Sequence, residues 1–325
     1  MNKTKLGNAG PEVSLIGLGC MGMSGMYGAS DEDESIATIH AAIDSGVNLL
    51  DTGDFYGMGH NEMLLGKALA GQRDKVVLSV KFGAMRAPDG SWTGVDGRPA
   101  AVKNFLAYSL QRLRTDYVDV YRLARLDPRV PIEETVGAIG DLIKGGYVKY
   151  VGLSEVGVDT IRKAHATHPI CDLQIEYSLL SRGLEAKILP VLRELGIAVT
   201  AYGVLSRGLL SGSEIKAGDI RSHLPRFKGT NFEQNKHLVA QLAQIAAQND
   251  ATPSEIAIAW VLSKGGDIIP ILGSRTRAQW KEVMSAVELQ LPPEEIQLLE
   301  EVFAGDRVAG TRYDPAQMRA LDSER

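Results

Sequence analysis

The chain has 325 residues, of which 44% are hydrophobic and 23% are charged, a composition typical of a globular enzyme and unlike that of a disordered chain. The net charge is −5 with acids and bases interspersed, so no basic face can follow a phosphate backbone and we expect no nucleic-acid partner. The two cysteines, together with an N-terminus that lacks a basic head before an apolar segment, disfavour secretion and a disulfide framework. We therefore expect a cytoplasmic protein. No apolar run reaches the roughly 18 residues that a membrane span needs.

Short apolar and β-branched runs alternate with helical patterns from one end of the chain to the other. Eight of these runs are candidate strands, at 14–19, 48–53, 75–83, 117–124, 148–155, 172–179, 198–204 and 267–274. The segments between them carry apolar residues at i, i+3 and i+4, and most end in glycine, as helices do. Eight strand–helix units predict an α/β fold, the (β/α)8 or TIM barrel. No linker rich in Pro, Gly or Ser divides the chain, so we expect a single domain over 1–325.

Two insertions and a tail depart from this alternation. A Gly-rich loop at 84–100 follows the third strand, and a stretch at 206–235 follows the seventh. Because both come after strands, we expect both over the C-terminal mouth of the barrel, where loops build sites. Together with the tail at 305–325 they should shape the substrate pocket, but their sequences do not identify the substrate.

The segment GLGCMG at 17–22 satisfies the dinucleotide fingerprint G-x-G-x-x-G directly after an apolar strand. In a Rossmann unit a helix begins within this motif, and an acidic residue ends the second strand about 20 residues later. Here no helical periodicity follows, and Asp51 comes later than the motif requires. The glycines are better explained by a tight exit from a strand near a ligand, which makes Gly19 and Met21 candidate cofactor contacts.

Three residues that could take part in catalysis lie at, or shortly after, the ends of successive strands. Asp51 ends the second strand, Tyr56 lies five residues beyond it, and Lys81 ends the third. A buried Lys beside a buried Asp keeps its charge, and this cation favours the phenolate form of a nearby tyrosine, which can then act as a general acid and base. Each residue also has an ordinary alternative, in which Asp51 caps a loop, Tyr56 packs and Lys81 is a solvated charge. The combination favours a catalytic set.

At these residues the chain resembles the aldo-keto reductases, in the branch with pyridoxal-reductase-like and channel β-subunit-like members. The motif D-T-A-x-x-Y-G-x-x-x-x-E-x-x-L-G appears as DTGDFYGMGHNEMLLG at 51–66, and segments at 132–155, 174–182, 201–212 and 271–279 follow in family order. The resemblance implies a barrel that binds NADPH and transfers hydride to an aldehyde or ketone. It also implies that Tyr56 supplies the proton and that Asp51 and Lys81 tune this tyrosine.

The same resemblance assigns the nicotinamide contacts. Ser154 and Gln174 stand at strand ends, where their side chains can hydrogen-bond the carboxamide, and Tyr202 can lie flat under the ring. The family's usual Asn after the serine is replaced by Glu155, so this position is given no role.

The phosphate contacts are expected after the seventh and eighth strands. The turn after the seventh offers backbone donors from Gly203, Val204 and Leu205, with Arg207 near the pyrophosphate. After the eighth strand a helix begins, and its unpaired N–H groups with Arg275 make an anion site suited to a 2′-phosphate. The expected set there is Gly273, Ser274, Arg275 and Gln279. The alternative is that Arg275 and Arg277 are solvated surface charges, and Val283 replaces an Asn that would contact the adenine.

One departure concerns the catalytic set itself. Family members read Tyr-Gln-His-Arg-x-Asp at the end of the fourth strand, where the His polarises the substrate carbonyl, and this chain has Ala124 in place of the His. Arg125 matches the family's arginine. Arg122 does not, and because it lies two residues before Ala124 it shares that face and could extend toward the mouth. Arg122 or a water could polarise the carbonyl in place of the His, or a bulkier substrate could occupy the vacated space. The remaining alternative is that the change is disabling.

The leading hypothesis is an NADPH-dependent oxidoreductase that reduces a carbonyl compound, with a reaction that could also run in reverse. The alternative is a nicotinamide-binding sensor or regulatory subunit with little turnover, which has less need of the set Asp51, Tyr56 and Lys81. A metal-dependent barrel enzyme is disfavoured because no cluster of His and carboxylate residues stands at the strand ends, so no metal is expected. The sequence does not indicate an oligomeric state.

Overall fold

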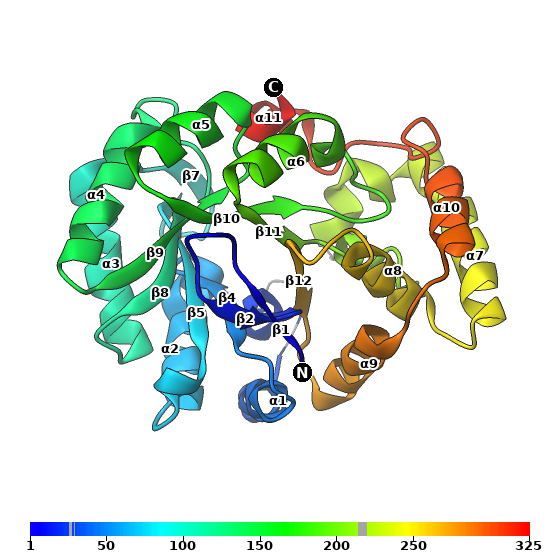
Figure 1. The fold of residues 1–325 in the computed structure, drawn as a ribbon, viewed down its shortest axis with the longest axis horizontal. Helices are drawn as coiled ribbons and strands as arrows, with labels where there is room; N and C mark the ends of the chain where they lie inside the picture. The colour runs from blue at the N-terminus through cyan, green and yellow to red at the C-terminus, as the bar shows by residue number, and fades with distance from the viewer. Residues whose placement is uncertain (26–27, 29, 214–219) are drawn as a thin grey trace.

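The computed structural model describes residues 1–25, 28, 30–213 and 220–325. Eight parallel strands close into a barrel at its centre, with β12 paired to β3 (Figure 1). They are β3 (Gly17–Gly19), β4 (Leu49–Gly53), β5 (Val77–Phe82), β8 (Val118–Leu123), β9 (Val148–Ser154), β10 (Ile170–Glu176), β11 (Ala198–Tyr202) and β12 (Ile268–Gly273). The predicted (β/α)8 barrel is confirmed, and each of the eight predicted strands overlaps one barrel strand.

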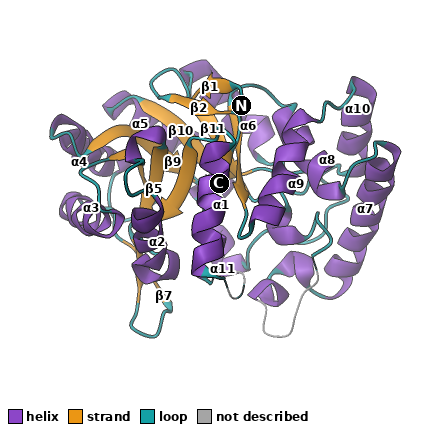
Figure 2. Cartoon of the chain, turned by 90° about the horizontal axis from the view of Figure 1, so that it is seen from below, coloured by secondary structure: helices purple, strands orange, loops and turns teal. Residues whose placement is uncertain are grey.

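Helices surround the barrel and cover the outward faces of its strands (Figures 1 and 2). They are α1 (Glu32–Asp44), α2 (His60–Ala68), α3 (Pro99–Leu113), α4 (Ile132–Lys144), α5 (Val158–Thr167), α6 (Leu184–Leu195), α7 (Gly229–Gln248), α8 (Pro253–Leu262), α9 (Arg277–Glu288) and α10 (Pro293–Val302). Local chemistry fixes where several of them begin. Asp31 caps α1 by accepting from the backbone N–H of Glu34, and Thr252 with Glu255 forms a capping box on α8.

A hairpin of β1 (Lys3–Lys5) and β2 (Glu12–Ser14) crosses the N-terminal end of the barrel (Figure 1). Its Leu6 and Val13 are fully buried and join the apolar interior cluster that includes Leu49, Val77 and Val120. This end is therefore closed and apolar, which leaves the opposite end of the barrel for chemistry.

All three variable segments contain regular structure. The segment expected as the loop 84–100 contains an antiparallel hairpin, β6 (Ala84–Arg86) and β7 (Trp92–Val95), before α3 begins at Pro99. The Trp92 ring lies 6.4 Å from the Phe55 ring, so the hairpin stands beside the residue that precedes Tyr56. The segment 206–235 contains short 3-10 helices and the first turns of α7, which begins at Gly229. Its residues 214–219 lie outside the described part of the chain.

The tail contains the short helix α11 (Pro315–Arg319) and returns to the loop that follows β9. The backbone N–H of Gly157 donates to Asp322 Oδ2 at 2.8 Å, and that of Ser323 donates to the carbonyl of Glu155 at 3.3 Å. The tail thus lies against the C-terminal end of a barrel strand. Among the described residues, no helix combines the length and apolar character needed to cross a membrane.

Candidate active site

Asp51 and Lys81 form a buried ion pair inside the barrel. Asp51 lies on β4 two residues after the interior Leu49, and Lys81 lies on β5 four residues after the interior Val77, so strand alternation turns both side chains inward. Lys81 Nζ stands 2.5 Å from Asp51 Oδ2, and each residue is only 4% exposed. Burial lowers the pKa of Lys81, while the charge of Asp51 opposes this effect.

The second oxygen of Asp51 is also held. Its Oδ1 accepts from Gln174 Nε2 at 2.8 Å and from Ser79 Oγ at 3.1 Å. Both oxygens of the carboxylate are therefore fixed in orientation, one by the lysine and the other by two neutral donors. Ser79 was not predicted as a site residue, although its interior position two residues before Lys81 follows from the alternation of the strand.

Tyr56 lies in the turn after β4 and is 6% exposed. Its ring centroid is 5.2 Å from Lys81 Nζ, and the Phe55 ring packs edge-on against it at 4.8 Å. The structure thus brings together the three residues that were predicted as a catalytic set. The phenol, the ammonium and the carboxylate form one connected group at the C-terminal end of β4 and β5.

Ala124 is the residue that the resemblance places where a histidine was expected. It is 1% exposed, and its N–H donates to the carbonyl of Phe82 at 2.8 Å. Arg125 follows it, donating from Nη1 to the carbonyl of Ala124 at 2.7 Å and from Nη2 to Tyr313 Oη at 3.4 Å. The charged side chain next to Ala124 in the sequence is therefore held by Tyr313 of the tail.

Arg122 corrects a prediction, because its side chain does not extend toward the mouth. It is fully buried inside the barrel, where Nη1 lies 2.9 Å from Asp172 Oδ2. On its strand it stands two residues deeper than Ala124, roughly 7 Å along the strand axis. Asp172 on β10 binds the guanidinium inside the barrel. The expectation that Arg122 extends toward the mouth and polarises a substrate carbonyl was therefore wrong about the direction of this side chain.

The residues expected around a nicotinamide lie on adjacent strands. Gln174 pairs in register with Ser154, and Tyr202 pairs with Glu176 on the neighbouring strand. Ser154 Oγ is buried, and among the described residues it has no hydrogen-bond partner. A buried hydroxyl without a partner is costly, and a ligand carboxamide would satisfy it. These residues therefore fit the cofactor that was predicted.

The residues expected near the adenosine phosphate lie after β12. Ser274 Oγ is likewise buried without a partner among the residues described, and the N–H of Arg275 donates to Gln279 Oε1 at 2.8 Å. Arg277 is an exposed charge, as the alternative expected, and it pairs with Glu34 at 2.8 Å. The free hydroxyl of Ser274 beside the start of α9 fits a phosphate-bearing cofactor.

The remaining predicted cofactor contacts lie on neighbouring strands and turns. Gly19 pairs in register with both Asp51 and Gly273, and Met21 begins the 3-10 turn beyond it. After β11 come Gly203, Val204 and Leu205. Arg207 contacts Glu176 Oε2 at 3.3 Å and the carbonyl of Arg312 at 3.2 Å, so part of its guanidinium is engaged with the tail.

The structure adds three residues that the sequence did not reveal, Glu155, Arg312 and Tyr313. Arg312 donates to both oxygens of Glu155, at 2.7 and 2.6 Å, and Tyr202 Oη donates to the same carboxylate at 2.7 Å. Burial opposes ionisation, but the bonds from Arg312 lower the pKa of Glu155 to about 2. Tyr313 Oη lies 3.1 Å from Tyr202 Oη. The only sequence signal was the replacement of Asn by Glu155.

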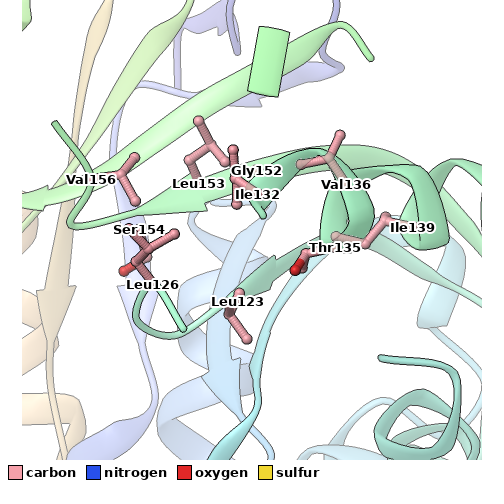
Figure 3. A pocket seen from close by; sticks show the side chains of 10 residues that line it. All are labelled: Leu123, Leu126, Ile132, Thr135, Val136, Ile139, Gly152, Leu153, Ser154 and Val156. Carbon is pink, nitrogen blue, oxygen red and sulfur yellow. The ribbon is translucent and has the colours of Figure 1, made fainter. Parts of the chain in front are cut away.

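A pocket on the outer wall of the barrel shares Ser154, but none of the other predicted site residues, with this site (Figure 3). It lies between β8, β9 and α4, and its lining is apolar apart from Thr135 and Ser154. Within the described ranges, no group of three or more His, Cys, Asp or Glu residues could hold a metal ion.

Comparison with known proteins agrees with this arrangement. The profile of the Aldo/keto reductase family matches residues 15–304. A probable aldo-keto reductase from Glycine max is 40% identical over 319 residues, which cover 95% of this chain and 91% of the relative. A glycerol dehydrogenase from Gluconobacter oxydans superposes with a TM-score of 0.84 at 29% identity, covering 94% of this chain and 95% of the other. An aldo-keto reductase from Bacillus halodurans, solved in its holo form, gives 0.79 at 30% identity, covering 94% and 97%.

The matching family is one of oxidoreductases that work with a nicotinamide cofactor. The chain belongs to the aldo/keto reductase family. Members of this family reduce carbonyl groups in general, which agrees with the predicted type of reaction.

Proposed function

We propose that this protein reduces an aldehyde or ketone to an alcohol with NADPH, and that Tyr56 donates the proton. The observation that carries this proposal is the buried pair of Asp51 and Lys81, 2.5 Å apart, with Lys81 Nζ 5.2 Å from the Tyr56 ring. An ammonium beside a phenol lowers the free energy of the phenolate that remains after proton transfer.

The roles of the chain's own groups follow from this geometry. Tyr56 gives its hydroxyl proton to the carbonyl oxygen of the substrate as that oxygen gains negative charge. Lys81 stabilises the resulting phenolate, and Asp51 keeps the lysine oriented and charged. When bound, the reduced nicotinamide supplies the hydride to the carbonyl carbon, so hydride and proton together convert the carbonyl to an alcohol. The same groups acting in reverse would oxidise an alcohol.

Cofactor binding is assigned to residues at the ends of β9 to β12. Ser154 and Gln174 would hold the carboxamide, and Tyr202 would pack on the ring. Ser274, Arg275 and Gln279 would hold the 2′-phosphate, which is the group that distinguishes NADPH from NADH. Two of these assignments are supported by buried hydroxyls, on Ser154 and Ser274, that have no partner among the described residues.

No side chain is assigned to polarise the substrate carbonyl at Ala124, because the sequence has no histidine there and Arg122 points into the barrel. Replacing an imidazole by a methyl group leaves room for on the order of one or two waters. We propose that a water or a bulky part of the substrate fills this space. Such a site would favour a larger ketone over a small aldehyde.

A single-turnover experiment tests the proposal. The protein is mixed with a slight deficit of NADPH, and oxidation of the bound cofactor is followed after addition of a panel of aldehydes and ketones. The reverse direction is measured with alcohols that include glycerol, because one structural neighbour is a glycerol dehydrogenase. Tyr56→Phe serves as the control. If NADPH binds tightly but no carbonyl compound in the panel oxidises it, the sensor or regulatory function replaces this proposal.

A further inference from the structure

A second buried ion pair, called the lower pair, lies two residues before Ala124 on one strand and two residues before Gln174 on another. Arg122 on β8 contacts Asp172 on β10, with Nη1 2.9 Å from Oδ2 and Nη2 3.0 Å from Oδ1, and both side chains are fully buried. Thr200 on β11 accepts from Arg122 Nη1 at 3.1 Å and donates to Asp172 Oδ2 at 2.6 Å. The pair therefore spans the barrel interior, and the proposed reaction does not use it directly.

The neighbouring strand leaves space for this pair by means of a glycine. A Cβ atom at Gly152 would stand 2.7 Å from Asp172 Oδ1 and 2.9 Å from Arg122 Nε, closer than real Cβ contacts. Arg122 Nε itself has no hydrogen-bond partner among the described residues. Buried ion pairs often stabilise a fold no better than apolar side chains of the same volume. Stability alone is thus a poor explanation for a charged pair with an unsatisfied donor at this depth.

One residue connects this pair to the catalytic group. Ser79 Oγ accepts from Arg122 Nη2 at 3.0 Å and donates to Asp51 Oδ1 at 3.1 Å. The hydroxyl can make both bonds at once, since it carries one donor and two acceptor sites. Because Arg122 fixes the acceptor side of Ser79, the proton of Ser79 is directed at Asp51.

We infer that Arg122, acting through Ser79, is a positioning residue that aims the Asp51 carboxylate at Lys81 and so holds the ammonium against Tyr56. The inference deepens the proposed function and rests on it for the role of Tyr56. In this arrangement Asp172 neutralises and orients Arg122, and Arg122 in turn orients Ser79. Ser79 and Gln174 together then hold Asp51 Oδ1. Asp51 Oδ2 is then left to face Lys81.

The charges agree with a functional link between the lower pair, Arg122 and Asp172, and the catalytic group. Lys81 and Arg122 are directly paired in register on β5 and β8. Burial is the main effect that lowers the pKa of Lys81; Asp51 opposes it, and the charge of Arg122 lowers the pKa further. A change in the lower pair is therefore expected to reach the groups that control proton transfer.

The variant Ser79→Ala breaks the connection and leaves both ion pairs in place. We expect kcat for carbonyl reduction to fall roughly tenfold, the effect of losing one hydrogen bond to a charged group, while KM for the carbonyl compound changes little. The matched control is Thr200→Val, which removes a hydroxyl from the same pair at the same depth but does not touch Asp51. It should lose stability to a similar degree and keep most of the wild-type kcat. Equal losses of kcat in the two variants overturn the inference.

A measurement that does not depend on turnover separates this inference from the proposed function. The ionisation of Tyr56 is followed by tyrosinate absorbance against pH, with Tyr56→Phe subtracted in each background. Ser79→Ala should move this ionisation to higher pH, because Lys81 is no longer held against the ring, whereas Thr200→Val should not. The double variant Arg122→Met with Asp172→Asn removes both charges of the lower pair and should give the same direction as Ser79→Ala. An unchanged titration overturns the inference even if reductase activity is found. A shifted titration in a protein that reduces no carbonyl compound supports the inference while the proposed function fails.

Discussion

Glu34 on α1 places its carboxylate on the first turn of α9, where Arg277 donates to it from its backbone N–H at 2.8 Å and from Nη2 at 2.8 Å. The start of α9 therefore already binds an anionic group, the carboxylate of Glu34 in the same chain. A carboxylate here would repel the 2′-phosphate of NADPH, which we assign to the neighbouring Arg275. Glu34→Gln should raise the preference for NADPH over NADH a few-fold, as measured by the dissociation constants of both cofactors. An unchanged ratio would mean that the phosphate binds elsewhere.

Arg275→Ala tests the phosphate assignment directly. NADPH binding should weaken by roughly 1.5–3 kcal/mol, the value of a charge-assisted hydrogen bond, and NADH binding should stay nearly constant. Fluorescence titration with each cofactor measures the two affinities. Lys281→Ala is the control, because it removes an exposed cation from the same helix four residues beyond Arg277 and leaves the pair of Arg277 and Glu34 intact. Equal losses for NADPH and NADH in Arg275→Ala would refute the assignment.

Tyr56→Phe tests the proton donor and keeps the packing of the ring. Turnover should fall by at least the roughly hundredfold that general acid catalysis contributes, and cofactor affinity should be retained. Single-turnover oxidation of bound NADPH gives the rate, and a parallel titration gives the affinity. Carbonyl reduction at a rate comparable with that of the unchanged protein would show that another group is the acid.

Ala124→His tests whether the missing histidine is an adaptation. The imidazole should raise turnover on small aldehydes, by at most about the 10²–10³ that one oxyanion donor is worth, and lower turnover on the physiological substrate by filling its space. Ala124→Phe is the control, since it fills the same space without a donor. The comparison is made by measuring kcat/KM over a series of carbonyl compounds of increasing size. A gain with every substrate would mean that Ala124 is a simple loss of function.

The sequence could predict those parts of the site that depend on local pattern. Strand alternation and the position at a strand end were sufficient to bring Asp51, Lys81 and Gln174 together inside the barrel. They could not predict the direction of Arg122. Its face of the strand was correctly expected, but its partner Asp172 is 50 residues away on another strand, and the depth at which the two meet depends on the register of the closed barrel.

The way in which the tail attaches to the barrel could not be predicted from the sequence, for a related reason. The segment 305–325 has no strong periodicity, and its attachment depends on Arg312 reaching a buried carboxylate on a distant loop. The hairpin β6–β7 was also missed, because its strands of three and four residues are too short for alternation to be recognised.

Asp54 should make the stability of the protein depend on pH. It is 7% exposed, and burial, followed by the charge of Glu62, raises its pKa from 3.8 to about 7, against the N–H of Gly83 and the charge of Arg112. Between these two values the folded protein keeps a proton that the unfolded chain releases. The contribution of Asp54 to the free energy of unfolding therefore falls as pH rises from about 4 to about 7 and is constant above that.

Asp54→Asn removes this titration. The variant should be more stable than the unchanged protein at about pH 8, by at most about 4 kcal/mol, and the difference should shrink toward about pH 5. Urea unfolding at both pH values measures this difference in the free energy of unfolding. The same change at the exposed Asp306 is the control and should leave the pH dependence as it was. Parallel curves for Asp54→Asn and the unchanged protein would contradict the prediction.

The ion pair between Glu155 and Arg312 has a consequence for how this sequence can evolve. The two residues are 157 positions apart, and each buries a charge that the other neutralises. Removing one partner would leave an uncompensated charge in the interior, which costs about 3–5 kcal/mol, whereas removing both together costs far less. Substitutions at the two positions should therefore be inherited together. Relatives that retain Asn at the position of Glu155 are expected to lack the arginine, and the pair should mark a distinct lineage within the family.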